Sequence, residues 1–127
     1  MKKFTMGMVL ITIIVFSGTV FAGGPPVYHI ALIDLKDEVT PEQIEEFIIV
    51  SQALISNIPG VLEASINKKA IDYRDIHIKD YDMAACVKWE SIDTAKVYGP
   101  HILHQTWYKL HKHMFESIRV IDFFGNY

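Results

Sequence analysis

The sequence predicts an α+β domain in which two helices cover one face of a four-stranded antiparallel sheet. Apolar residues recur at every second position in four segments and at helical spacing in two regions. These segments follow one another as strand, helix, strand, strand, helix, strand. Half of the 127 residues are apolar, which suffices for a buried core, and the formal net charge of −3 argues against nucleic acid as a partner.

The first 22 residues have the layout of a secretory signal peptide. Lys2 and Lys3 precede an apolar run over residues 6–16, and Val20 and Ala22 occupy the positions three residues and one residue before a cleavage site. A retained membrane anchor is the alternative, but this run is shorter than the roughly 20 residues that a span needs. We therefore expect an exported protein, periplasmic or secreted, whose single domain covers residues 23–127 and has no membrane contact after cleavage.

The first expected strand covers residues 28–35 and has two apolar faces. One face is formed by Tyr28, Ile30, Leu32 and Asp34, and the other by His29, Ala31, Ile33 and Leu35. A strand with one face in water would alternate cleanly between apolar and polar residues. We therefore expect this strand to be covered on both sides.

The first helix has the clearest start signal in the chain. Thr40 and Gln43 have the spacing of a capping box, and Pro41 suits the first helical position. An apolar stripe at helical spacing continues to Ile58, after which Pro59 and Gly60 end the helix.

The middle of the chain predicts two strands, at residues 61–67 and 81–90. Residues 68–80 between them mix charged and apolar side chains and are expected to form a long, partly mobile connection. Cys86 is the only cysteine and lies in an apolar run, so a buried, unreactive thiol is expected.

The last third of the chain predicts an interrupted helix and a closing strand. Ser91 can cap the helix, Pro100 interrupts it after Tyr98, a second helical segment covers about 101–115, and residues 117–124 form the strand. This order of elements is the ferredoxin-like split βαβ arrangement, with one sheet face bare. Because that face is apolar, we expect a homodimer in which two sheets pack face to face as an α+β barrel.

Several short runs, taken in order, resemble a known family. They are Tyr28-His29-Ile30-Ala31-Leu32, Leu35 to Gln43, Ile58-Pro59-Gly60-Val61, Trp89-Glu90-Ser91, Tyr98, His101, His104 and Val120-Ile121-Asp122-Phe123. Together they resemble the stress-responsive A/B barrel (Dabb) domain over about residues 28–124. The resemblance implies a dimeric α+β barrel but no single activity, since members include plant stress proteins, uncharacterised bacterial proteins and a plant polyketide cyclase.

The resemblance also assigns candidate site residues. Tyr98 and His104 match the tyrosine and histidine that the cyclase uses for ring closure, and His101 matches the other histidine of the Tyr-x-x-His-x-x-His pattern. His29 matches a first-strand histidine near the pocket, whereas Met83 stands where the cyclase has a pocket histidine.

The chemistry of these residues supports three hypotheses. In the first, the protein binds a small apolar or carbonyl compound or protects against stress, and Tyr98 and His104 serve mainly as buried hydrogen-bonding groups. In the second, it is a cofactor-independent lyase or cyclase in which His104 is the base and Tyr98 holds a carbonyl oxygen. The apolar walls of the pocket in either case would be Ala31, Ile33, Leu54, Trp107, Phe115 and Ile118.

The third hypothesis is a metal or haem site. His101, His104, His111 and His113 lie within 13 residues. His111 and His113 diverge on a helix, however, and no pair has the His-x-x-x-His spacing. A solvated, histidine-rich helix is therefore the simpler interpretation, and we expect no metal and no cofactor.

Overall fold

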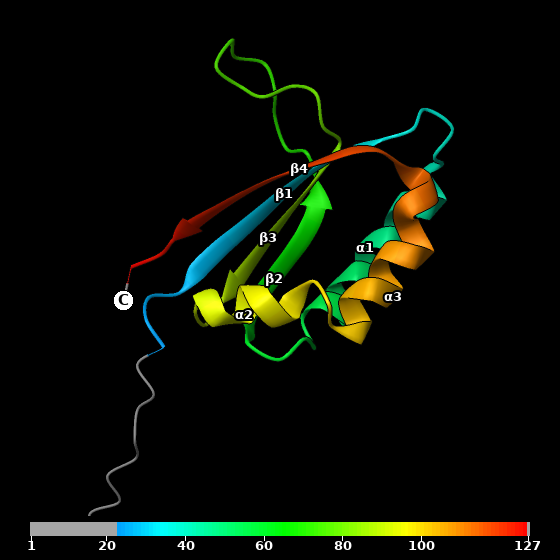
Figure 1. Ribbon diagram of the computed structural model, residues 1–127. Helices are drawn as coiled ribbons and strands as arrows, with labels where there is room; N and C mark the ends of the chain where they lie inside the picture. The colour runs from blue at the N-terminus through cyan, green and yellow to red at the C-terminus, as the bar shows by residue number, and fades with distance from the viewer. Residues whose placement is uncertain (1–22, 127) are drawn as a thin grey trace, which may run out of the picture.

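The computed structural model describes residues 23–126, so the predicted signal peptide lies outside the described residues. The elements in order are β1 (Val27–Leu35), α1 (Pro41–Ile55), β2 (Val61–Lys68), β3 (Met83–Trp89), α2 (Ile92–Tyr98), α3 (Ile102–His111), the 3-10 turn η1 (Lys112–Met114) and β4 (Phe115–Phe124). The strands form one antiparallel sheet in the order β2-β3-β1-β4, and the helices lie on one side of it (Figure 1). The predicted ferredoxin-like fold class is confirmed.

The central strands β1 and β3 divide their side chains between two faces as the sequence predicts. On β1, Val27, Ala31 and Ile33 are buried beneath the helices, whereas the residues between them are only half-buried. On β3, Met83 and Val87 are buried on the same face. The core therefore lies between the helices and one face of the sheet.

Helix α1 begins as predicted and ends earlier than the apolar stripe suggests. The backbone N–H of Gln43 donates to Thr40 Oγ1 at 3.2 Å, and the N–H of Thr40 donates to Gln43 Oε1 at 2.8 Å, which completes the capping box. The helix ends at Ile55, and Ile58 is buried from the following turn. The apolar stripe continues past the helix because turn residues also contribute to the core.

The interrupted helix differs from its prediction at both ends of its second segment. Helix α3 begins at Ile102, and His101 is its N-cap in an extended conformation (ψ 141°), so His101 and His104 do not share a helical face. The helix ends at His111, and Phe115 is the first residue of β4 instead of the last of a helix. The imidazole of His101 replaces the usual capping hydroxyl, because its Nδ1 accepts a hydrogen bond from the N–H of Leu103 at 3.1 Å.

The other face of the sheet is not covered by the helices. Its apolar members include Tyr28, Ile30 and Ile121, and the β1–β4 register places Ile30 directly opposite Ile121. Cys86 also lies on this face and is only half-buried in the single subunit, so the expected full burial of its thiol is not seen there.

Candidate functional site

Five rings form a continuous cluster between the sheet and the break between α2 and α3. The imidazole of His29 stacks on Trp89 with ring centroids 4.6 Å apart, and Tyr98 lies 5.0 Å from Trp89. His104 is 4.8 Å from Tyr98 and 5.5 Å from Trp107. The cluster thus joins side chains from β1, β3, α2 and α3.

Local structure explains why these rings meet. His29 and Trp89 project from the helix-covered face of adjacent strands, since Trp89 pairs with Val27, two residues from His29. Tyr98 is the last residue of α2, and His104 lies in the first turn of α3. The interruption of the helix at Gly99 and Pro100 therefore brings Tyr98 and His104 over the same end of the sheet.

A carboxylate from β4 orients the imidazole of His29. Asp122 is the cross-strand partner of His29, and its Oδ1 lies 2.7 Å from His29 Nδ1. Because a carboxylate only accepts, Nδ1 carries the proton in this hydrogen bond. This hydrogen bond fixes the orientation of the His29 ring. It involves only Nδ1, so Nε2 takes no part in it.

Burial sets the charge states of Tyr98 and His104. Tyr98 is 6% exposed, and burial raises the pKa of its phenol, so the hydroxyl stays neutral and able to donate. Burial lowers the pKa of His104, although a hydrogen bond to the Gly99 carbonyl opposes this shift. At neutral pH His104 is therefore an uncharged imidazole.

Two ring nitrogens in the cluster are buried without a hydrogen-bond partner among the described residues. They are Nε1 of Trp89 and Nδ1 of His104. Buried polar atoms in native proteins are nearly always paired, so two unpaired atoms in one cluster require an explanation. A polar group of a bound molecule is one such explanation.

The predicted site residues separate into three groups. The cluster contains His29, Tyr98, His104 and Trp107, and Phe115 packs on Trp107 at 5.7 Å. His101 is the cap of α3 and is not a member of the stacked cluster. The third group is part of the apolar core and consists of Ala31, Ile33 and Met83.

Sequence reasoning gave no site role to Trp89 or Asp122. Both lie in segments that the family resemblance includes, but composition alone gives no reason to select them. The usable signal is register: once β1 pairs with β4, a carboxylate opposite His29 on the same face becomes a hydrogen-bond partner. That pairing joins residues 93 positions apart and cannot be read from local sequence.

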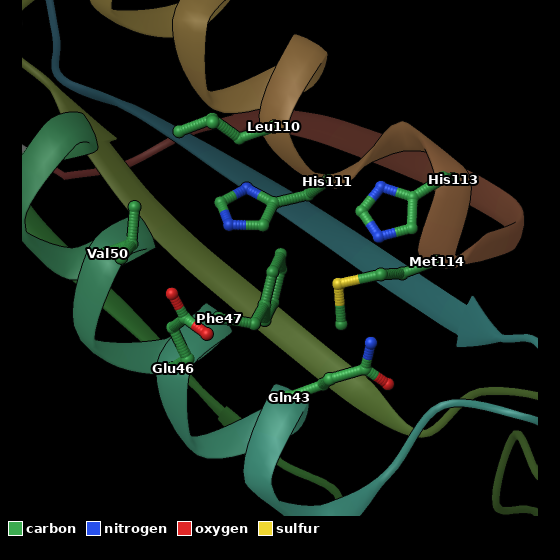
Figure 2. A pocket seen from close by; sticks show the side chains of 8 residues that line it. All are labelled: Gln43, Glu46, Phe47, Val50, Leu110, His111, His113 and Met114. Carbon is green, nitrogen blue, oxygen red and sulfur yellow. The ribbon is translucent and has the colours of Figure 1, made fainter.

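The histidines at the end of α3 face a separate groove of about 190 Å³ between α1 and α3. Figure 2 shows His111 and His113 directed from α3 and η1 towards Gln43, Glu46 and Phe47. Within residues 23–126, no group of three or more His, Cys, Asp or Glu side chains is arranged to hold a metal ion.

A four-stranded antiparallel sheet in the order β2-β3-β1-β4, with its helices on one face, defines a ferredoxin-like α+β fold. The chain belongs to the stress responsive A/B barrel domain (Dabb) family, whose model matches residues 27–124. The predicted family is therefore confirmed. Within residues 23–126, none of the helices combines the length and apolar character needed to cross a bilayer.

Solved structures with the same fold include proteins with and without assigned roles. A dimeric ferredoxin-like protein of unknown function from Thermobifida fusca is 24% identical, with a TM-score of 0.69 and coverage of 80% of this chain and 92% of that one. The protein At3g17210 from Arabidopsis thaliana is 25% identical, with a TM-score of 0.70 and coverage of 80% and 96%. Hydroxynitrile lyase from Passiflora edulis is 17% identical, with a TM-score of 0.69 and coverage of 80% and 94%. A search of curated proteins found no significant match.

Proposed function

We propose that this protein is a homodimeric binding protein for a small aromatic carbonyl compound, held at the ring cluster. The observation that carries the proposal is the pair of unpaired, buried ring nitrogens, Trp89 Nε1 and His104 Nδ1. An indole N–H can only donate, so its partner must be an acceptor such as a carbonyl oxygen. The surrounding aromatic rings favour a flat apolar body attached to that oxygen.

The homodimer is supported by the bare sheet face and by similar proteins. An apolar sheet face left in water is unfavourable, and a second copy can cover it symmetrically. The Thermobifida fusca structure is described as dimeric. Two sheets packed through this face would leave both ring clusters on the outer, helix-covered sides.

Export is part of the same proposal and rests on the N-terminal sequence. Expression of the full chain in a bacterium, followed by periplasmic extraction, should give a protein that begins at Gly23 by mass spectrometry. A purified chain that still begins at Met1 would contradict export.

Binding can be tested with benzaldehyde as the probe. In two-dimensional NMR of the uniformly ¹⁵N-labelled protein, the indole Nε1–H signal of Trp89 should shift on titration. The indole of Trp107 belongs to the same cluster, but its Nε1–H already donates to Ser51 Oγ at 2.7 Å, so its signal should shift less than that of Trp89. Trp89→Phe should weaken binding at least about tenfold, the loss expected for one buried hydrogen bond. Equal shifts of both indoles, or none, would refute the proposed site.

A second candidate function, a cofactor-independent lyase or cyclase, is supported by the charge states of the cluster. A neutral His104 could accept a proton from the carbon next to a carbonyl group, while the Tyr98 hydroxyl donates to the resulting enolate oxygen. With phenylacetone in D₂O, such a site would exchange α-hydrogen for deuterium faster than buffer does. The rate should fall about 100-fold or more in His104→Ala. If phenylacetone binds but its α-hydrogen is not exchanged, the binding function is still supported and the lyase or cyclase function is excluded for this compound.

A further inference from the structure

The connection between β2 and β3, residues 69–82, is fastened to the sheet at several points. At its base, the N–H of Lys69 donates to the Asp82 carbonyl at 2.7 Å, and the N–H of Leu35 donates to Asp82 Oδ2 at 2.8 Å. Within the loop, Lys69 Nζ lies 2.8 Å from Asp72 Oδ2 and donates to the Lys79 carbonyl at 3.1 Å. These contacts give the loop a defined conformation.

An ion pair places this loop on the uncovered side of the sheet. Arg119 belongs to the uncovered face of β4, and its Nη1 lies 2.9 Å from Asp80 Oδ2. Leu32, on the same face of β1, lines a groove with apolar side chains of the loop. In Figure 1 the loop projects beyond the sheet on the side away from the helices.

The loop exposes several large apolar side chains to solvent. Ile71, Ile76 and Ile78 are 57%, 74% and 54% exposed, and all three line the groove shared with Leu32. Exposed apolar side chains are common singly, but a contiguous set usually marks an interface. This set is continuous with the uncovered sheet face that we assign to the dimer.

We propose that residues 69–82 form a dimer arm, which packs its three isoleucines against the second copy of this chain. The inference rests on the proposed homodimer, because a partner sheet seated on the uncovered face comes next to a loop that projects from that face. In a two-fold dimer the contact occurs twice, so each isoleucine removed is lost from two places. The arm extends the interface beyond the sheet, and the Arg119–Asp80 pair holds it in place.

The test compares three variants by sedimentation equilibrium over a range of protein concentrations. The arm variant carries Ile71→Ser, Ile76→Ser and Ile78→Ser. The matched control carries Ile49→Ser, Val97→Ser and Ile102→Ser, three helix residues of similar exposure (70%, 53% and 68%) on the other side of the molecule. The sheet variant carries Ile30→Lys and Ile121→Lys on the uncovered face.

The dimer Kd of the arm variant should be at least about tenfold higher than that of the wild-type protein. The dimer Kd of the control should stay within about twofold of the wild-type value. Both variants should keep the wild-type circular dichroism spectrum. A dimer Kd unchanged by the arm substitutions, with the sheet variant monomeric, would overturn the arm and leave the dimer intact. If the wild-type protein is monomeric at all concentrations, the proposed dimer itself is overturned.

Discussion

At the residue scale, a buried hydrogen bond joins α1 to α3 in the centre of the core. Trp107 Nε1 donates to Ser51 Oγ at 2.7 Å, and Ser51 is fully buried. Ser51→Ala leaves the indole N–H unpaired and should lower the free energy of unfolding by about 1–3 kcal/mol. Urea denaturation measures this loss. In the double variant with Trp107→Phe, the Ser51 substitution should cost less than it does alone, and full additivity would contradict the interaction.

Two histidines make stability depend on pH near neutrality. Burial lowers the pKa of His104 and of His111; the charge of His29 lowers the pKa of His104 further, while His113 lowers and Glu46 raises the pKa of His111. A pKa lower in the folded state means that the unfolded chain binds these protons first. Their contribution to stability is therefore complete above the unfolded value of about 6.5 and is lost as pH falls through the folded values.

The midpoint of urea unfolding should accordingly be constant from about pH 8 to 7 and decrease from about pH 6.5 downwards. His111→Gln should reduce the slope of this decrease, because one of the two protonation sites is removed. A slope identical to that of the unchanged protein would show that His111 binds protons equally in both states.

Residue-level prediction succeeded where the signal is local. Thr40 and Gln43 are three residues apart, so their capping box follows from spacing alone and is present. His101 was predicted as the first residue of a helical segment and is instead its N-cap, because an imidazole is an uncommon cap and Pro100 determines only roughly where α3 begins. The Asp122 partner of His29 required strand pairing, which local spacing does not supply.

At the element scale, the turn between α1 and β2 depends on one glycine. Gly60 has φ +87°, and a Cβ there would lie 2.4 Å from Thr94 Oγ1 at the start of α2. Gly60→Ala combines the cost of a left-handed backbone with a steric clash against a buried side chain. We expect a loss of at least about 2 kcal/mol in the free energy of unfolding.

Gly99→Ala is the matched control for this prediction. Gly99 has a helical conformation with φ −61°, and an added Cβ would meet no atom within 4 Å. This substitution should be neutral or stabilising by up to about 1 kcal/mol in thermal and urea unfolding. Comparable losses in the two variants would contradict the role assigned to Gly60.

The elements themselves follow from periodicity, and their ends do not. All four strands and both helical regions are present, because periods of two and 3.6 survive over seven or more residues. The helix ends are set by tertiary contacts: Ile58 belongs to the apolar pattern of α1 but is buried from the turn, and Phe115 begins β4 opposite Leu35. A single chain's pattern cannot distinguish an apolar residue in a helix from one in the adjoining turn.

At the scale of the whole molecule, the composition of β1 already indicates a second apolar layer. Ile30 and Leu32 alternate with buried residues yet face away from the helices, and both are half-buried in one subunit. The position of the loop over the same face could not be predicted, because its tether, Arg119 to Asp80, joins residues 39 positions apart. The fold, and the expectation of a homodimer, thus follow from the sequence pattern, whereas the proposed arm depends on a contact that only the structure supplies.

The uncovered face gives the strongest prediction at this scale. Ile30 and Ile121 are directly opposite each other on β1 and β4, and Ile121 is 63% exposed in one subunit. Lysine at both positions costs little in a monomer, because the ammonium groups reach water. In a face-to-face dimer each unpaired charge would be buried, at about 3–5 kcal/mol. The double variant should therefore raise the dimer Kd at least about 100-fold and remain folded.

Thermal unfolding provides a second measurement of the same change. For a dimer that unfolds to monomers, Tm rises with protein concentration, whereas the Tm of a folded monomer does not. The unchanged protein should show this rise, and the Ile30→Lys, Ile121→Lys variant should not. Neither isoleucine contributes to the core beneath the helices. If the variant is already unfolded before heating at every concentration, the uncovered face is needed for the stability of the helix-covered face.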